Sequence, residues 1–349
     1  PFNYHELRRR NNQKQIETLV VDGDALLKRS FFGAKDVFNE KKEHIGGLYQ
    51  FINILRKTLS EKYYDKVVVF WDGQYGNLTR RKIYPNYKTN RKKSKNYDNN
   101  SFLRQKIRTQ QYLEELYVRQ YVDQDTEADD LIAHYCLNKK DNEVITIYTA
   151  DRDIVQLVNE GVYVFLLDKK ELVKEDTVLT TRDLDYLPKN VCLVKMLIGD
   201  SSDNILGIKG LSPKRLGELV PELKTRKVEL EEIKKIEYEG DNWRVTKVLN
   251  NIKTGTSNGG VFGDELYQIN KKIINLNEPF INEGARKNVE DLLNLNLDPT
   301  GRDYKNVIRM MIDDGIVNII PASYEDQSEF LMPFITLKNN EKKNGKNKE

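Results

Sequence analysis

Nine acidic residues stand out in five short clusters, and four of these clusters follow an apolar run or begin a helical pattern. The clusters are VVDGD, VFWDG, DTEADD, TADRD and GDSSDN, and the nine acids are Asp22, Asp72, Glu127, Asp129, Asp130, Asp151, Asp153, Asp200 and Asp203. A parallel sheet would gather such residues at one edge, beyond the carboxyl ends of its strands. Two unit charges about 4 Å apart repel by about 4 kcal/mol at an effective dielectric of about 20, so gathered carboxylates need metal ions or shared protons. All-oxygen ligands favour Mg²⁺ or Mn²⁺ over zinc.

Short apolar runs rich in Val, Ile and aromatic residues alternate with helical patterns in the first half of the chain. We expect strands at 18–26, 66–72, 117–122, 144–150 and 162–168. Apolar residues at helical spacing lie between them, from Leu48 to Leu59 and again after Thr126. This alternation predicts an α/β fold, in which helices flank a central, mostly parallel sheet with right-handed crossovers. After residue 185 helical patterns dominate, and 254–260 is expected to be a flexible loop.

Composition narrows the kind of protein and the kind of site. The net charge of +3, from 57 basic and 54 acidic side chains, conceals strong local segregation. The sequence has no apolar run of the roughly 20 residues that cross a bilayer, so we expect a soluble cytoplasmic protein without a membrane partner. We also expect a monomer. Only Cys136 and Cys192 are present, which argues against a disulfide or a zinc site.

The segment from 79 to 108 is strongly basic and contains a single acid, Asp98. Its basic residues are Arg80, Arg81, Lys82, Lys88, Arg91, Lys92, Lys93, Lys95, Arg104, Lys106 and Arg108. Four aromatic residues are interleaved with them, a mixture typical of surfaces that hold a polyanion with stackable bases. A solvated charged helix or loop would explain such a run in a generic protein. Its position directly after the Asp72 cluster favours substrate contact.

The sequence GIKGLSPKR at 207–215 predicts a turn between two short helices. Two glycines let backbone amides approach a phosphate, and the following helix can present its N-terminus. By itself the motif could be an ordinary helical hairpin. It follows GDSSDN closely, so we expect it to clamp a nucleic acid backbone without reading sequence, and to release it at high salt. The expected contacts are Gly207, Lys209, Gly210, Ser212, Lys214 and Arg215.

Paired hard cations about 3.5 to 4 Å apart would activate a water and stabilise the leaving oxygen of a displacement at phosphorus. The reaction class predicted is therefore phosphodiester hydrolysis. Neighbouring cations would neutralise charge that develops on the phosphate, and Lys88, Arg91 and Arg81 are the candidates. We expect Arg80, Lys92 and Lys93 to contact the nucleic acid backbone. For any single acidic pair a structural role is the simpler interpretation, and only the joint arrangement favours catalysis.

These motifs, in this order and spacing, resemble the 5′ nuclease superfamily, which comprises flap endonucleases, the 5′ nuclease domains of bacterial DNA polymerases and phage 5′ to 3′ exonucleases. The resemblance covers about residues 16 to 220 through VVDGD, FWDG, YKTNR, TEADD, TADRD and GDSSDNILGIKG. The segments TRRKIYPNYKTNRKK and GRDYKNVIRMMIDDGI look most like the ribonucleases H of T-even phages.

The resemblance implies a site for two Mg²⁺ ions, for which Mn²⁺ can substitute. The first ion would lie among Asp22, Asp72, Glu127, Asp129 and Asp151, with Asp130 close by. The second would lie among Asp153, Asp200 and Asp203, with Asp151 shared. Lys88 and Arg91 match the family's arch residues, which contact the scissile phosphate. The hairpin matches a helix-three-turn-helix that holds a monovalent cation, although Ser212 replaces the usual second glycine.

The resemblance also implies a domain organisation. We expect a basic N-terminal extension at 1–15, an α/β nuclease domain at 16–185 with a helical arch at about 79–115, a helical DNA-binding domain at 186–322 with the helix-three-turn-helix at about 190–220, and a flexible tail at 323–349. In the tail, Gln327, Phe330 and Phe334 resemble a peptide that docks on a sliding clamp, and the alternative is packing on the core.

The predicted function is a divalent-metal-dependent 5′ to 3′ exonuclease and 5′ flap endonuclease. Its substrates would be branched or nicked duplex DNA and RNA/DNA hybrids with 5′ ends. The biological role would be removal of RNA primers from lagging strands in phage DNA replication, in the host cytoplasm, with a sliding clamp and a single-strand-binding protein as partners. The alternatives are a PIN-type single-strand ribonuclease and a non-catalytic DNA-binding scaffold.

Overall fold

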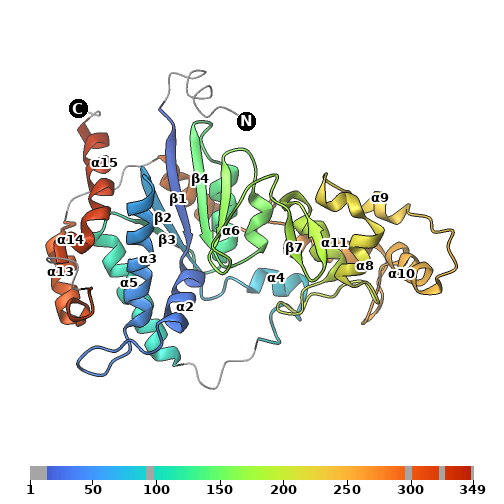
Figure 1. The fold of residues 1–349 in the computed structure, drawn as a ribbon, viewed down its shortest axis with the longest axis horizontal. Coiled ribbons are helices and arrows are strands. Elements are labelled where there is room, and N and C mark those ends of the chain that lie inside the picture. Colours follow the sequence, from blue (N-terminus) through green and yellow to red (C-terminus); the bar gives the residue numbers. More distant parts are fainter. Residues whose placement is uncertain (1–13, 92–97, 295–300, 322–326, 347–349) are drawn as a thin grey trace.

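The central element is a six-stranded sheet with the strand order β3-β2-β1-β4-β5-β6 (Figure 1). The structure is a computed structural model that describes residues 14–91, 98–294, 301–321 and 327–346. The strands are β1 (Ile16–Asp22), β2 (Lys66–Trp71), β3 (Arg119–Val122), β4 (Glu143–Thr149), β5 (Val162–Leu166) and β6 (Glu171–Val173). The first five run parallel and β6 pairs antiparallel with β5. The predicted mostly parallel α/β sheet is confirmed.

Helices cover both faces of the sheet and continue beyond it. Those of the first half are α2 (Gly23–Gly33), α3 (Gly46–Glu61), α4 (Leu78–Ile83), α5 (Asn99–Glu115), α6 (Ala128–Leu137) and the 3-10 helix η1 (Asp153–Leu157). Those of the second half are α7 (Val191–Ile198), α8 (Pro213–Leu219), α9 (Leu230–Lys234), α10 (Trp243–Thr254), α11 (Asp264–Ile274), α12 (Glu283–Asn294), α13 (Tyr304–Asp313), α14 (Gln327–Leu331), η5 (Met332–Phe334) and α15 (Ile335–Lys346). Among the described residues, no helix is both long and apolar enough to span a bilayer.

The alternation of side chains along each strand divides the core into two clusters. Val20 of β1 and Val68 of β2 face α6 and lie in the first cluster. Leu19 and Val21 face the opposite side and pack in the second cluster with residues of α3 such as Phe51. All of these residues are fully buried, as expected for central parallel strands that helices cover on both faces.

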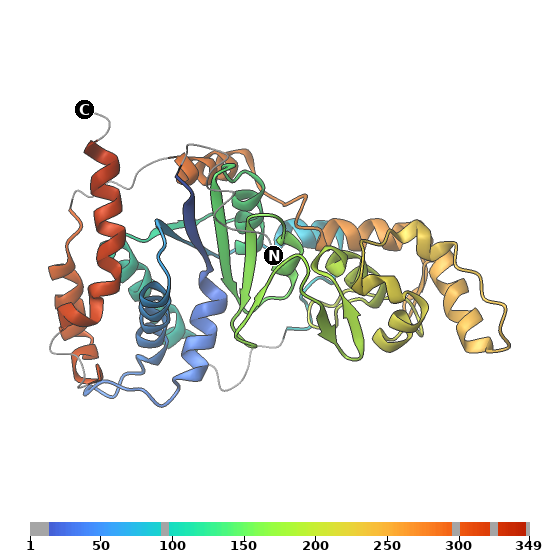
Figure 2. The same cartoon turned by 45° about the horizontal axis from the view of Figure 1, so that its top comes forward.

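The first cluster extends from the sheet through α7, α8, α10 and α11, so the helical region shares a continuous core with the sheet. Figure 2 shows these helices projecting from one side of the sheet. Buried amides attach α11: Asn270 donates to the carbonyls of Met196 at 3.0 Å and Leu206 at 2.7 Å. Gln156 of η1 donates to the carbonyl of Ile274 at 3.0 Å. These bonds orient the helical region relative to the strand ends.

Two local expectations are corrected. The strand expected at 18–26 ends at Asp22, because the carboxylate of Asp22 accepts a bond from the amide of Ala25 at 3.0 Å and caps α2. Gly23 packs so closely on Trp71 that a Cβ atom would lie 2.6 Å from its ring. The loop expected at 254–260 contains a small hairpin, β9 (Thr256–Ser257) and β10 (Gly260–Val261), and a second hairpin comprises β7 (Leu179–Thr181) and β8 (Leu184–Tyr186).

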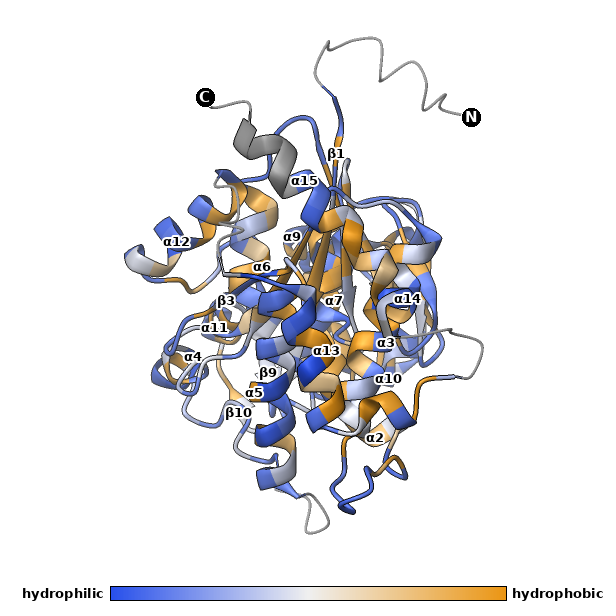
Figure 3. Cartoon of the chain, turned by 90° about the vertical axis from the view of Figure 1, so that its left-hand side faces the viewer, coloured by the Kyte–Doolittle hydropathy of each residue, from blue (hydrophilic) through white to orange (hydrophobic). Residues whose placement is uncertain are grey.

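The C-terminal segment returns to the sheet. Figure 3, which views the molecule from this side, shows α13, α14 and α15 beside α3 and α5. Asp314 accepts bonds from Arg108 at 2.8 Å and Tyr112 at 2.7 Å, both in α5. Residues 301–321 therefore pack on the α/β layer, whereas the sequence placed 186–322 in the helical DNA-binding domain.

The flexible tail predicted at 323–349 is wrong for the part that the structure describes, because 327–346 is helical. Phe330 is 1% exposed and Phe334 is 0% exposed, and both belong to the second core cluster. The guanidinium of Arg56 lies 5.0 Å from the ring of Phe330. These aromatic rings cover α3 and are not presented to a sliding clamp. The expected clamp peptide also includes Gln327, whose side chain lies outside the described residues.

We expect Phe334→Ala to lower the free energy of unfolding by about 3 to 5 kcal/mol, as large-to-small changes of buried aromatic residues do. Urea denaturation of the full chain measures this change. Met332→Ala is the matched control, because Met332 lies in the same short helix and is 54% exposed. Equal, small effects of the two substitutions would show that the C-terminal helices do not belong to the folded core.

Candidate active site

A cavity of about 940 Å³ opens at the carboxyl ends of β1, β2 and β4. Five of the nine expected carboxylates line it, together with Lys28, Lys88 and Arg91. These five are Asp22, Asp72, Glu127, Asp129 and Asp151. The sheet therefore brings together acids that lie up to 129 positions apart in sequence (151 − 22 = 129).

Backbone and hydroxyl groups at the strand ends orient the carboxylates. Thr149, the last residue of β4, donates from its hydroxyl to Asp22 at 3.0 Å. The amide of Ala128, at the start of α6, donates to Asp72 at 2.9 Å. Asp151 accepts a bond from the amide of Asp153 at 2.8 Å. Each acid is thus held where its strand ends.

Burial and mutual repulsion make ionisation of Asp22, Asp72 and Asp129 unfavourable in the protein alone. Burial, followed by the charge of Asp72, raises the pKa of Asp22 to about 7. Burial and the neighbouring Asp24 raise the pKa of Asp72 above its usual range. Burial, Asp151 and Asp22 raise the pKa of Asp129 well above its usual range. A cation placed among these oxygens would relieve the repulsion.

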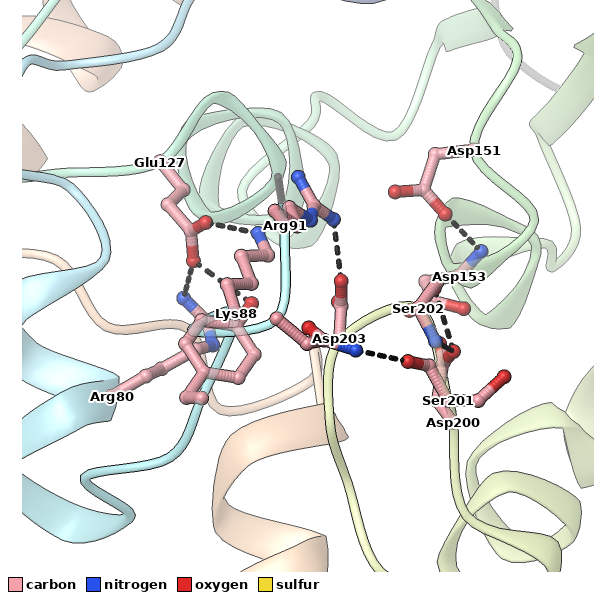
Figure 4. Close-up of polar contacts among 12 residues, drawn as sticks. Arg80, Lys88, Arg91, Glu127, Asp151, Asp153, Asp200, Ser201, Ser202 and Asp203 are labelled. Carbon is pink, nitrogen blue, oxygen red and sulfur yellow. Dashed lines mark hydrogen bonds and ion pairs between the residues drawn. The ribbon is translucent and has the colours of Figure 1, made fainter. Parts of the chain in front are cut away.

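A second group of acids adjoins the first (Figure 4). Asp153 lies at the start of η1, and Asp200 and Asp203 lie in the loop after α7. Each offers a carboxylate oxygen, and these oxygens lie within 4.8 Å of one another. Such an all-oxygen donor set fits a hard divalent cation. Both groups therefore fit the metals that the sequence predicts.

Lys195 of α7 is a site residue that the motif analysis missed. Its ammonium forms ion pairs with Asp153 and, at 2.6 Å, with Asp200. Burial and Asp151 raise the pKa of Asp153 to about 7 despite this contact. Burial acts against ionisation of Asp200 as well, but Lys195 and Ser202 outweigh it and lower its pKa to about 2. The available signal was a lone lysine in the apolar helix VCLVKMLI, five residues before Asp200.

The two expected phosphate-binding residues are paired with acids of both groups. Lys88 contacts Glu127, and Arg91 contacts Asp203 (Figure 4). The amide of Lys88 donates to the carbonyl of Asp203 at 2.9 Å, and Lys88 itself has a φ of 56°, which is strained for a residue with a side chain. Burial acts to raise the pKa of Glu127, but Lys88 and Arg80 outweigh it and hold that pKa below its usual range.

Arg80 does not have the place expected for it, whereas Asp130 lies close to the first acidic group without lining the cavity. Arg80 is 3% exposed and binds Asp130 through two bonds of 2.5 and 2.9 Å, and Glu127 through one of 2.7 Å. Asp130 is fully buried and also accepts the amide of Phe280 at 3.0 Å. The two side chains form a buried ion pair. Arg80 is therefore not presented to DNA, and Asp130 does not line the cavity.

Other basic residues of the segment differ in their surroundings. Arg81 donates to the carbonyl of Tyr87 at 3.0 Å, which places it at the base of the turn that carries Lys88. Lys92 and Lys93 lie outside the described residues. Lys106 of α5 binds Asp24 at 2.9 and 3.0 Å, and Asp24 in turn accepts the amide of Asp72 at 2.7 Å. Asp24, an acid without a counterpart in the motifs, therefore supports a cavity residue.

The predicted hairpin joins α7 and α8 and lies next to the second acidic group. A Cβ atom at Gly207 would lie 2.0 Å from the carbonyl of Ile198, and Gly210 has a φ of 78°, so both positions require glycine. Ser212 caps α8 by accepting the amide of Arg215 at 3.1 Å. The backbone of Lys209 donates to Thr256 at 2.9 Å, which joins the turn to the β9–β10 hairpin. The side chains of Lys209 and Lys214 are exposed.

Comparison with known proteins gives a family match to the same region. The model of the 5′-3′ exonuclease N-terminal resolvase-like domain matches residues 17–183. A 5′-3′ exonuclease of Mycoplasma pneumoniae is 31% identical over 208 residues, which cover 56% of this chain and 69% of that protein. DNA polymerase I of Caldicellulosiruptor bescii is 30% identical over 212 residues, which cover 59% of this chain but only 24% of the polymerase.

Solved structures of a bacteriophage T5 enzyme share the fold. The T5 flap endonuclease in a pseudo-enzyme-product complex with DNA and metal ions has a TM-score of 0.59 and 17% identity, over 80% of this chain and 100% of that one. The T5 5′-exonuclease with bound zinc ions has a TM-score of 0.52 and 18% identity, over 85% of this chain and 97% of that one. At such identities the likeness establishes the fold alone. Taken with the curated relatives, it leads to one conclusion: the chain belongs to the 5′-3′ exonuclease family of the 5′ nuclease superfamily.

Proposed function

We propose that this protein is a divalent-metal-dependent 5′ to 3′ exonuclease and structure-specific 5′ flap endonuclease. The observation that carries the proposal is the pair of adjoining acidic groups at the sheet edge, with Lys88 and Arg91 bound to one member of each. Membership of a nuclease family and the metal ions and DNA in the T5 structure support it. The substrates would be DNA and RNA/DNA duplexes with free 5′ ends.

The two acidic groups would each bind one divalent metal ion. Asp22, Asp72, Glu127, Asp129 and Asp151 would hold one Mg²⁺ or Mn²⁺ ion, and Asp153, Asp200 and Asp203 would hold another. When bound, such ions activate a water and stabilise the charge that develops at phosphorus. Asp151 would link the two groups, since it binds the amide of Asp153 while lining the main cavity.

Lys88 and Arg91 would position the scissile phosphate. Both lie at the border between the two acidic groups, held there by Glu127 and Asp203. An incoming phosphate would compete with these carboxylates for the side chains of Lys88 and Arg91. The carboxylates would then bind the metal ions instead. The positive charge would then neutralise the phosphate oxygens as the reaction proceeds. Arg81, bound to the carbonyl of Tyr87, would support the same turn.

The turn at 207–215 would hold the duplex beside the cavity. Lys209, Gly210 and Lys214 are exposed, so the turn presents both basic side chains and backbone to a ligand. Contacts to phosphates alone would select shape over sequence and weaken with salt. The proposal also includes a monovalent cation at this turn. It further includes a monomeric cytoplasmic enzyme that removes RNA primers during phage replication and acts with a single-strand-binding protein.

Asp151→Asn should reduce cleavage of a 5′-flapped duplex by roughly 100-fold or more, because a metal-held charge supplies several kcal/mol to such reactions. Binding of the same duplex should persist, since the duplex-binding turn is unchanged. Gel-shift and end-label cleavage assays measure the two effects. Asp125→Asn, at an exposed position, is the control. Full activity of Asp151→Asn would disprove the metal assignment.

Cleavage of two substrates separates this function from that of a PIN-type ribonuclease. With Mg²⁺ present, we expect rapid release of the 5′ flap from a flapped or nicked duplex and little cleavage of single-stranded RNA. The expected reason is that the basic turn after Asp203 would hold the phosphates of a duplex next to the cavity. A preference for single-stranded RNA would favour the PIN-type alternative.

Without metal, the stability of the protein should fall as the pH rises from about 4 to about 7. Asp22 and Asp153 have pKa values raised from 3.8 to about 7, so the folded state binds their protons more tightly than the unfolded state does. That advantage is present at low pH and disappears as these carboxyls ionise, with a loss on the order of a few kcal/mol. The pKa of Asp200, lowered from 3.8 to about 2, changes the stability only below about pH 4 and therefore does not affect this pH range.

Urea denaturation in EDTA at pH 5 and pH 8 measures this dependence, and Mg²⁺ should remove most of the difference. Asp22→Asn should flatten the profile because it deletes one of the carboxyls whose pKa is raised. Equal stability at the two pH values in EDTA would contradict the electrostatic account of the site.

A further inference from the structure

Lys195 occupies the space between two of the three acids that would bind the second metal ion. It projects from α7, and its ammonium contacts Asp153 on one side and Asp200, at 2.6 Å, on the other. The side chain is 22% exposed, so water screens the contact only in part. Asp203, the third acid, is paired with Arg91 instead. Lys195 is thus the main countercharge of Asp153 and Asp200.

An ammonium group and a divalent ion held by the same carboxylates repel each other and compete for the space between them. Mg²⁺ binds carboxylate oxygens at about 2.0 to 2.1 Å and requires near-octahedral geometry. The nearby ammonium would therefore oppose entry of the ion, and the double charge of the metal strengthens this repulsion. Binding of a second ion therefore requires Lys195 to withdraw.

The structure offers a place to which the ammonium can withdraw. A cavity of about 270 Å³ adjoins the second acidic group, and Lys195, Asp153 and Asp200 all line it. Residues of β7 and β8 also line this cavity, among them Thr181 and Tyr186, whose hydroxyls are 3.2 Å apart. The four-carbon stem of lysine allows such a displacement, because it has several rotatable bonds.

We infer that Lys195 is an internal competitor of the second divalent ion, which keeps that site weak until the ammonium moves aside. The inference rests on the proposed function, because it assigns Asp153, Asp200 and Asp203 to a metal. It adds that the affinity of this site is set by a side chain that is not a ligand. A role confined to packing in α7 would leave metal affinity unchanged.

The test is Mn²⁺ binding to the full-length protein without nucleic acid, measured by electron paramagnetic resonance and calorimetry. Lys195→Met keeps the length of the side chain and removes its charge, and should tighten the weaker Mn²⁺ site by about tenfold or more. Lys195→Arg keeps the charge and should leave this site weak. Lys189→Met is the matched control, because Lys189 is an exposed lysine just before the same helix.

A second readout is the thermal shift produced by Mg²⁺. In EDTA, Lys195→Met should melt below the wild type, because Asp153 and Asp200 lose their countercharge. Saturating Mg²⁺ should then raise its melting temperature by more than it raises that of the wild type. If Lys195→Met folds only with bound metal, the stabilisation by Mg²⁺ is larger still, which supports the inference. The Mn²⁺ titration of Lys195→Arg is then an independent check.

Two results would overturn the inference. One is an unchanged or weakened second Mn²⁺ site in Lys195→Met. The other is equal tightening in Lys195→Met and Lys195→Arg, which would show that the charge of Lys195 is not what weakens the site. The proposed function fails in a different way, through the absence of a second Mn²⁺ ion in every variant together with the absence of flap cleavage.

Discussion

Repulsion among carboxylates at one end of the sheet is the constraint on which the rest of the structure depends. The parallel strands bring Asp22, Asp72 and Asp151 to the same edge of the sheet. The protein meets this repulsion with cations from other elements, since Lys88, Arg91 and Lys195 each bind an acid of the site. These pairs also join the basic segment, the loop after α7 and α7 itself to the sheet.

The part of this arrangement that depends on local sequence could be predicted. Buried parallel strands require continuous apolar runs, and those runs located all five parallel strands within a few residues. An acid that follows such a run must lie at the sheet edge, so the cavity residues Asp22, Asp72 and Asp151 followed from the pattern. The glycines at 207 and 210 likewise have a local cause, because close approach and a positive φ exclude other residues.

Long-range pairing could not be predicted. Basic side chains look alike in sequence, yet Arg80 is buried against Asp130, while Lys195, in an apolar helix, reaches the second acidic group. The polar C-terminus suggested a solvated tail, but Phe330 and Phe334 find a hydrophobic surface on α3, more than 250 positions earlier (330 − 61 = 269). In each case the partner belongs to a distant element, and only the folded chain shows which partner it is.

The link from Lys106 through Asp24 to the backbone of Asp72 has a mechanical consequence. Lys106 belongs to α5, which contains the last part of the basic segment, and its ammonium lies 5.4 Å from the ring of Trp71 at the end of β2. A rotation or slide of α5 therefore pulls directly on the peptide that carries Asp72. One carboxylate, that of Asp24, thus couples the position of α5 mechanically to the end of β2.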